Sequence, residues 1–320
     1  MAGEHRILLF GANGQVGWEL RSALGPLGAV RALARAEADL CEPDSLVSAI
    51  RGMAPTLIVN AAAYTAVDRA EDTDEEKTAI AANTTAPGIL AEEAKRLGAA
   101  MVHYSTDYVF DGTRPVRPED PAAWYREEDA TGPLNVYGRT KLAGETAVLD
   151  TGVPALVFRT SWVYSLRGRN FLRTVLNLAA GRDTLSMVAD QHGAPTWARA
   201  IAQATALVIA RWGTGGGVDP SRRGIYHMTA AGATTWHGFA TAIVRHAASS
   251  GQPLACAPGA IKPIPSDAFP TAATRPKNSL LSNERLHRAF GIALPHWETS
   301  LSLCLEDGWC TLPAGVPTNR

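Results

Sequence analysis

The sequence predicts an α/β fold in which a doubly wound parallel sheet is followed by a smaller second domain. Three observations lead to this prediction. The first half of the chain alternates short apolar runs with helix-like stretches, as βαβ units do. The apolar runs are nearly continuous and are bounded by Gly, Pro and Asn, which is typical of strands buried on both faces. The length of 320 residues is enough for about two domains of ordinary size.

The elements of the first half follow from this pattern in chain order. Strands are expected at residues 6–10, 30–33, 57–60 and 100–104, where apolar residues run together. Helices are expected at residues 15–24, 44–53, about 75–97 and 136–149. Open parallel sheets bind their ligands beyond the carboxyl ends of the strands, so the residues after each strand are the first candidates for a site.

Beyond Phe158 the pattern is less regular, because Pro, Trp and Gly interrupt it. The segment from Gly213 to Pro220 is predicted to be a surface loop, and the strongly apolar segment from Ala198 to Trp212 is predicted to be a helix that returns to cover the first domain. We therefore expect a first domain over residues 1–165, joined by the helix at 198–212, and a discontinuous second domain over residues 166–320.

The charge and the composition exclude several classes of partner. Thirty Lys and Arg nearly balance thirty-one Asp and Glu, which gives a net charge of -1 and no general attraction for nucleic acid or an anionic membrane. No apolar run approaches the ~20 residues that span a bilayer, and the run at residues 7–10 is too short for a signal peptide. We expect a cytoplasmic protein that binds a small molecule.

The cysteines predict neither a metal site nor a redox pair. They form no CxxC pair and no cluster with His, and we expect them to be reduced; they are Cys41, Cys256, Cys304 and Cys310. Motifs for a P-loop, a zinc protease or a serine hydrolase are also missing from the sequence.

A glycine-rich turn lies between the first strand and the first helix. Gly11, Gly14 and Gly17 have the spacing GxxGxxG at the point where a dinucleotide-binding fold places the pyrophosphate. One glycine permits the tight turn, one lets the backbone approach phosphate, and one lets the helix pack closely on the strand. The helix N-terminus adds N–H donors and partial positive charge. The turn therefore predicts a Rossmann-type NAD(P)-binding domain.

The end of the second strand discriminates between NAD and NADP. An acidic residue there binds the ribose 2′-hydroxyl, whereas a basic residue accommodates a 2′-phosphate. No carboxylate follows the strand immediately and Arg35 is available, so we expect a preference for NADPH over NADH unless Arg35 is only a solvated surface residue. Asp39 and Leu40 are placed to touch the adenine side of the cofactor, and residues 62–65, Ala62, Ala63, Tyr64 and Thr65, to line its middle.

A tyrosine and a lysine are candidates for proton transfer. Tyr137 and Lys141 are four residues apart, which brings both side chains to one face of a helix. A neighbouring cation favours phenolate, so Lys141 is expected to lower the pKa of Tyr137 and make it a usable general acid. Ser105 and Thr106 end the fourth strand, where a hydroxyl can hydrogen-bond to a substrate oxygen beside Tyr137. The alternative is a surface pair without chemistry.

These motifs together resemble those of the extended short-chain dehydrogenase/reductases. Longer strings resemble one family in that class, the dTDP-4-dehydrorhamnose reductases, over about residues 7–280. These strings are LFGANGQVGWEL at 9–20, VNAAA at 59–63, HYSTDYVF at 103–110, PLNVYG at 133–138, FRTSWVY at 158–164, DQHGAPT at 190–196 and RPKNS at 275–279.

The resemblance implies that NADPH or NADH reduces the C4 ketone of dTDP-4-dehydro-β-L-rhamnose, with Tyr137 delivering the proton, Lys141 holding the nicotinamide ribose and Thr106 bonding the reacting oxygen. By family position, the implied cofactor contacts are Gly14, Gln15, Val16, Asp39, Leu40, Ala63, Tyr64, Thr65 and Tyr104. The implied nucleotide-sugar contacts are Thr106, Asp107 and Trp162, with Arg275 and Asn278 as further candidates. Trp162 could instead be core packing, and Arg275 and Asn278 could be structural loop residues.

The sequence departs from the family pattern in three places. The segment between Thr106 and Tyr137 is several residues longer, an acidic residue is missing after the second strand, and Arg199 stands where some members have an acidic metal ligand, although Glu19 matches another. No metal is therefore expected, and a homodimer is left open. Two alternatives also stay open: a reductase of another dTDP-4-keto sugar, of the dihydrostreptose-forming type, or a non-catalytic nucleotide-binding regulator like the regulatory subunit of methionine adenosyltransferase.

Overall fold

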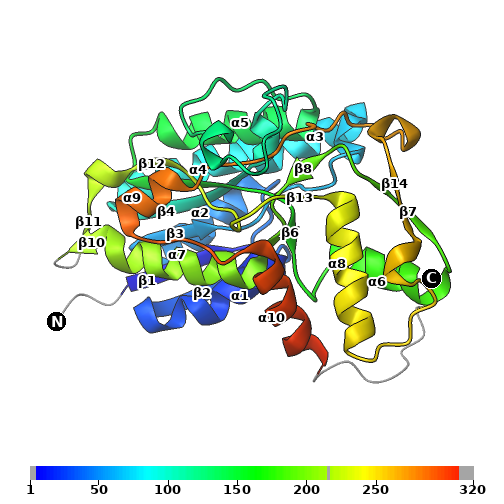
Figure 1. The fold of residues 1–320 in the computed structure, drawn as a ribbon. Coiled ribbons are helices and arrows are strands. Elements are labelled where there is room, and N and C mark those ends of the chain that lie inside the picture. The colour runs from blue at the N-terminus through cyan, green and yellow to red at the C-terminus, as the bar shows by residue number, and fades with distance from the viewer. Residues whose placement is uncertain (1–4, 215–216, 310–320) are drawn as a thin grey trace.

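The computed structural model describes residues 5–214 and 217–309 of the chain. Six parallel strands form the central sheet in the order β12-β5-β4-β3-β1-β2 (Figure 1). Their bounds are His5–Phe10 for β1, Gly28–Leu33 for β2, Leu57–Asn60 for β3, Ala100–Thr106 for β4, Ala155–Thr160 for β5 and Gly224–His227 for β12. The predicted parallel sheet is confirmed, and the strand order reverses between β1 and β3, where sheets of this kind bind a dinucleotide.

Helices cover both faces of the sheet, because successive residues of each strand point to opposite faces. Helices α1 (Gln15–Ala23) and α7 (Ala198–Trp212) pack together on one face (Figure 1). Helices α2 (Pro43–Met53), α4 (Ala86–Leu97) and α5 (Val136–Leu149) cover the other face. Each face of the sheet has its own hydrophobic core. In β1, Ile7 and Leu9 belong to the core under α1 and α7, and Leu8 and Phe10 belong to the core under α2, α4 and α5. The doubly wound architecture is thereby confirmed.

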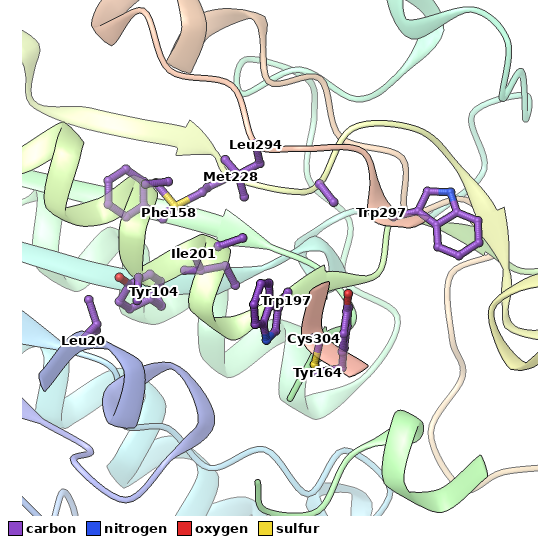
Figure 2. Close-up of a cluster of buried hydrophobic side chains, with 14 of the residues drawn as sticks. Leu20, Tyr104, Phe158, Tyr164, Trp197, Ile201, Met228, Leu294, Trp297 and Cys304 are labelled. Carbon is purple, nitrogen blue, oxygen red and sulfur yellow. The ribbon is translucent and has the colours of Figure 1, made fainter. Parts of the chain in front are cut away.

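The core under α1 and α7 continues into the second half of the chain. Tyr104 and Phe158 from the sheet lie in one apolar cluster with Ile201 of α7, Trp297 and Cys304 (Figure 2). The helix predicted at residues 198–212 forms with those bounds. One continuous core therefore joins the sheet to the elements that follow it.

The second half, where the structure describes it, supplies short strands and further helices. The helices are α6 (Phe171–Gly181), α8 (Trp236–Ser249), α9 (Glu284–Phe290) and α10 (Trp297–Trp309). Short two-stranded sheets pair β6 (Val163–Tyr164) with β9 (Thr196–Trp197), β8 (His192–Gly193) with β13 (Thr234–Thr235), and β7 (Leu185–Val188) with β14 (Ile261–Ile264). Strand β12 also comes from this half, yet it pairs with β5 in the main sheet.

Two expectations need correction. The helix predicted at about 75–97 is divided into α3 (Thr73–Ile80), a π-helical turn (Ala81–Thr85) and α4. The reason is Pro87, which has no N–H to give to the carbonyl of Asn83 and would clash with it in a continuous α-helix. The loop predicted from Gly213 to Pro220 contains a short antiparallel pair, β10 (Gly213–Thr214) and β11 (Gly217–Val218).

Other expectations concern cysteines, metals and membranes. Cys41, Cys256 and Cys304 are free thiols, and Cys310 lies outside the described residues. Across residues 5–214 and 217–309, no group of three or more His, Cys, Asp or Glu side chains is arranged to hold a metal ion. None of the helices in the same residues combines the length and the apolar character needed to cross a membrane.

Candidate active site

The glycine turn between β1 and α1 has the geometry of an anion cradle. A Cβ at residue 17 would stand 2.0 Å from the Gly11 carbonyl oxygen, so only glycine permits this close approach. Gly11 itself has a positive φ of 87° and lies against the backbone of Ala61 and Ala62. Within residues 5–214 and 217–309, no side chain caps the N-terminus of α1, which leaves its N–H groups available to a phosphate. The turn therefore fits the pyrophosphate of NAD(P).

Residue 15 ties this turn to the second half of the chain. The Gln15 Oε1 atom accepts hydrogen bonds from Ser165 Oγ and Asn170 Nδ2, both at 2.9 Å. The side chain predicted to contact cofactor is thus anchored on the segment after β6. Ser165 and Asn170 carry no motif of their own, so sequence reasoning did not single them out.

The end of β2 carries both a cation and a carboxylate. Arg35 is largely exposed, and its Nε is 2.8 Å from Asp39 Oδ2, so the two predicted cofactor residues form an ion pair. Glu37 Oε2 accepts a hydrogen bond from the Ala34 N–H at 2.9 Å and lines an open pocket of about 690 Å³ with Ala12 and Asn13 of the glycine turn. The carboxylate that the sequence analysis missed after β2 is therefore Glu37, held there by the turn.

Asn83, in the π-helical turn, shapes the segment predicted to line the middle of the cofactor. Its Oδ1 accepts from the Tyr64 N–H at 2.9 Å, and its Nδ2 donates to the Tyr64 carbonyl at 3.1 Å and to Thr140 Oγ1 at 3.2 Å. One buried amide thus fixes the backbone beside Ala63 and Thr65 against α5. The sequence offered one signal for it, the proline four residues later.

The proton-transfer group lies where α5 begins, beside the end of β4. Asn135 caps α5 by accepting from the Gly138 N–H at 2.8 Å. The ring of Tyr137 contacts that of Tyr108 edge to face, with centroids 5.8 Å apart. Thr106 Oγ1 donates to Asp107 Oδ1 at 3.0 Å and accepts from the Tyr108 N–H at 3.2 Å. The predicted residues of β4 and α5 are therefore brought together.

The ionisation of Tyr137 differs from the expectation. Burial raises the pKa of Tyr137 to about 12, the charge of Asp107 adds to the rise, and the Thr106 hydroxyl opposes it. The expected lowering by Lys141 is not found: burial and Asp107 decide the pKa, and the Lys141 side chain donates instead to the Tyr104 carbonyl at 2.6 Å. In this state Tyr137 is a neutral phenol at physiological pH, the form that donates a proton.

Asp107 is a buried carboxyl beside the same group. It is 3% exposed, and its Oδ2 has no hydrogen-bond partner among the described residues. Burial raises the pKa of Asp107 to about 6, although the hydroxyls of Ser279 and Thr106 favour the charged form. An unpartnered oxygen of this kind suits a ligand hydroxyl.

Trp162 stands at the boundary of the two halves in a strained conformation. Its φ is 48°, and its ring stacks on Trp236 of α8 with centroids 3.5 Å apart. A Cβ at residue 193 would stand 2.5 Å from the Trp162 ring, so Gly193 leaves room for it. The indole is only partly buried, which keeps both the predicted sugar contact and a packing role open.

The two remaining residues that were predicted to contact the sugar, Arg275 and Asn278, are bonded to other residues of the protein. Arg275 makes a bidentate ion pair with Asp68, with N–O distances of 2.7 and 3.1 Å. Asn278 is 1% exposed, donates to the Arg114 carbonyl and accepts from the Leu280 N–H, both at 3.0 Å. The amide of Asn278 therefore fastens the longer loop after β4 to the chain, which favours its structural role.

The side chains of Tyr104 and Leu40, two predicted cofactor contacts, are packed in the hydrophobic cores. The Tyr104 ring is buried and its hydroxyl lies 2.7 Å from Thr205 Oγ1 of α7, so the predicted cofactor contact is left to its backbone. Leu40 is likewise packed in the core under α2. Both side chains face away from solvent.

An ion-pair group occupies the surface where α1, α7 and α10 meet. Arg199 Nε is 3.0 Å from Glu19 Oε2, and another of its nitrogens bonds to Asp307. Arg199, which stands where some family members have an acidic residue, thus places a positive charge between the carboxylates of Glu19 and Asp307.

A dinucleotide fold with a tyrosine and a lysine one helical turn apart beside the central strand defines an NAD(P)-dependent reductase of the short-chain dehydrogenase/reductase class. The family described as RmlD substrate binding domain matches residues 5–309. A dTDP-4-dehydrorhamnose reductase of Burkholderia thailandensis is 50% identical over 304 residues, covering 94% of this chain and 98% of that protein. The one of Salmonella typhimurium is 44% identical over 95% of this chain and 98% of that protein. The chain belongs to the dTDP-4-dehydrorhamnose reductase family.

A solved structure extends the likeness to three dimensions. The dTDP-4-dehydrorhamnose reductase of Bacillus anthracis in complex with NADP superposes with a TM-score of 0.82 at 30% identity, covering 95% of this chain and all of that one. The fold is also that of a UDP-glucose 4-epimerase from Thermus thermophilus, with a TM-score of 0.75 at 16% identity and coverage of 96% of this chain and all of that one. The prediction of an NADP-linked or NAD-linked reductase is confirmed.

Proposed function

We propose that this chain uses NADPH, or NADH, to reduce the C4 ketone of dTDP-4-dehydro-β-L-rhamnose to dTDP-β-L-rhamnose, the last step of dTDP-L-rhamnose biosynthesis. The single observation that supports it best is that Tyr137 and Lys141, one turn apart on α5, both reach the end of β4. The Thr106 hydroxyl interacts with Tyr137 there, and Lys141 donates to the Tyr104 carbonyl. The relatives named above carry that activity in their names, and they match this chain over nearly its whole length.

The cofactor, when bound, supplies the hydride that adds to C4. The proposal assigns the pyrophosphate to the uncapped N-terminus of α1 and the glycine turn. Lys141 is assigned to the nicotinamide ribose, because its buried ammonium keeps donors beyond the one used by the Tyr104 carbonyl. Arg35 is assigned to a 2′-phosphate at the end of β2.

Tyr137, as a neutral phenol, is assigned to supply the proton that the substrate oxygen takes up. As the carbonyl π bond breaks, the substrate oxygen gains negative charge and takes the phenol proton of Tyr137. Thr106 is assigned to hold that oxygen, and the free Oδ2 of Asp107 and the partly exposed face of Trp162 are assigned to the sugar. Proton transfer from a positioned side chain contributes about 10²–10⁴-fold to rate.

A direct assay tests the proposal. Purified protein is mixed with dTDP-4-dehydrorhamnose and NADPH, the loss of NADPH absorbance is followed, and the sugar product is identified. We expect dTDP-L-rhamnose, and a kcat about 10²–10⁴-fold lower for Tyr137→Phe with unchanged NADPH binding. No turnover by the wild type, or turnover only of another dTDP-4-keto sugar, contradicts the proposed function; full activity of Tyr137→Phe contradicts the proposed acid.

A further inference from the structure

Three buried side chains form a line from the sheet to Lys141. Asn60 ends β3 and is paired with His103 of β4, and both are 0% exposed. Asn60 Nδ2 lies 3.2 Å from His103 Nδ1, and His103 Nε2 lies 3.4 Å from Lys141 Nζ. Neither Asn60 nor His103 has a part in the proposed chemistry, so their placement needs its own explanation.

The backbone fixes which end of the Asn60 amide faces His103. The Ala62 N–H donates to Asn60 Oδ1 at 3.1 Å, so the oxygen is used and the NH₂ group points at His103 Nδ1. A ring nitrogen that accepts a hydrogen bond carries a lone pair, and the hydrogen of the neutral ring is then on Nε2. Burial, together with the charge of Lys141, holds the pKa of His103 well below its usual value, so the ring is neutral.

The Nε2–H of His103 therefore points at Lys141. An ammonium group has three donors and no acceptor, so it meets this N–H unfavourably, whereas a neutral amine accepts from it. The charged group that acts on Lys141 is Glu145, one turn later on α5, which raises its pKa. Glu145 is itself bound to Arg159 of β5 at 2.7 Å, with both side chains buried. Tyr137, one turn earlier on α5, is a neutral phenol.

We propose that Asn60 and His103 are positioning residues for Lys141: Asn60 holds His103 in its Nε2–H tautomer, and that N–H favours the neutral amine of the lysine over the ammonium. The inference rests on the role proposed above for Lys141. Burial lowers the pKa of Lys141 to about 8, with Glu145 opposing the change, so the lysine changes charge near physiological pH. The pair thereby adjusts how much positive charge faces the ribose and Tyr137.

The tautomer is tested first, on the unmodified enzyme. A ¹⁵N–¹H spectrum of the free protein labelled on histidine separates Nε2–H from Nδ1–H rings. The signals of His103 are those lost in His103→Phe or, should that variant not fold, in His103→Gln. We expect the Nε2–H tautomer between pH 6 and 9, and an Nδ1–H or charged ring overturns the proposal.

The charge of Lys141 is tested by titration. The chain has five lysines, so selective ¹³Cε labelling gives few signals, and Lys141→Arg assigns the one of interest. In His103→Phe we expect its midpoint to rise by about one pH unit, because the N–H that opposes the ammonium is gone. Val102→Ala weakens the packing of the same strand without touching that N–H, and its midpoint should equal that of the wild type.

These spectra need neither substrate nor cofactor, so they separate the inference from the proposed function. An unchanged midpoint in His103→Phe, or an equal rise in Val102→Ala, overturns the role of His103. A raised midpoint in an enzyme that does not turn over dTDP-4-dehydrorhamnose keeps the inference and contradicts the proposed function.

Discussion

Gly138 lies so close to Tyr108 that a Cβ at residue 138 would stand 2.3 Å from the Tyr108 carbonyl oxygen. This contact sets the distance between the first turn of α5 and the end of β4. Tyr137 and Thr106 sit on the two sides of it, so the absence of a side chain at residue 138 is what lets the proton donor approach the strand.

Gly138→Ala should therefore impair catalysis more than folding. The added methyl group displaces either the first turn of α5 or the segment after Thr106, and a misplacement of about 1 Å costs about 100-fold in rate. We expect kcat/KM to fall by about that factor while the circular dichroism spectrum keeps its wild-type shape. The control is Gly52→Ala in α2, where no described residue beyond the neighbouring helix backbone lies within 4 Å of the added Cβ; the activity of this variant should be unchanged.

Much of the sheet and the glycine turn could be predicted because they depend on local sequence. Apolar runs, helix periodicity and the GxxGxxG spacing each report on neighbouring residues, and β1, α1, α5 and α7 formed where they were expected. Glu37 was not predicted, because its carboxylate reaches the end of β2 only through the bend that returns it to Ala34. Strand β12 was missed because its partner β5 lies more than sixty residues earlier.

The candidate site shows the same limit. The spacing of Tyr137 and Lys141 put them on one helical face, yet their ionisation depends on burial and on Asp107, which spacing does not report. Contacts between distant segments, such as Gln15 with Asn170, are visible only once both halves of the chain are in place.

Asp107 should make the folded state less stable as pH rises. Its pKa is raised by burial from 3.8 to about 6, so the folded protein holds the proton more tightly than the unfolded chain. The contribution of the protonated Asp107 to the free energy of unfolding is fully present below about pH 4 and is lost as pH rises through about 6. Asp107→Asn, which stays neutral, should thus exceed the wild-type free energy of unfolding by about 1–3 kcal/mol at pH 8 and match it near pH 4. Urea unfolding across this range measures the difference.

Glu93 serves as a control, because its effect on the free energy of unfolding changes with pH in the opposite direction to that of Asp107. The Arg51 side chain, helped by Arg96, lowers the pKa of Glu93 from 4.5 to about 2, so its contribution is present above pH 4.5 and is lost as pH falls through about 2. Because Arg51 is half exposed, solvent screens part of the gain. Glu93→Gln should cost about 1 kcal/mol at pH 7 and little near pH 2. If both variants shift stability in the same direction at pH 8, the assignment for Asp107 is wrong.

Arg35 and Glu37 should pull the cofactor preference in opposite directions. Arg35→Ala removes the cation proposed to bind a 2′-phosphate, and we expect the NADPH-to-NADH ratio of kcat/KM to fall about tenfold, since a hydrogen bond to a charged group is worth about 1.5 kcal/mol or more. Glu37→Gln removes a negative charge from the pocket that Glu37 lines with Ala12 and Asn13, and it should raise the ratio. Both ratios come from initial rates with each cofactor.

Arg31 provides the matched control on the same strand. It lies between Val30 and Ala32, which line the pocket, and strand alternation directs its side chain to the opposite face. Arg31→Ala removes one exposed positive charge without touching the pocket, so its ratio should equal that of the wild type. An equal fall in Arg31→Ala and Arg35→Ala contradicts a specific contact and indicates a general charge effect.

Asn83→Ala should weaken both the fold and cofactor binding. It removes the hydrogen bonds that hold the Tyr64 N–H and carbonyl and leaves these groups without their partner. Because an unsatisfied, partly buried polar group costs about 1–3 kcal/mol, we expect a loss of about 2–3 kcal/mol in the free energy of unfolding. The freed segment is the one proposed to line the cofactor, so the Kd for NADPH should rise as well.

Thr84→Val separates these two effects within the same π-helical turn. Among the residues that the structure describes, the Thr84 hydroxyl bonds only to the Thr140 carbonyl, at 2.8 Å, and has no hydrogen bond to Tyr64. Its loss should lower stability by about 1 kcal/mol and leave the Kd for NADPH, measured by cofactor fluorescence, unchanged. A raised Kd in both variants would show that the whole turn, rather than the Asn83 amide, shapes the cofactor segment. An unchanged Kd in both would remove residues 62–65 from the cofactor site.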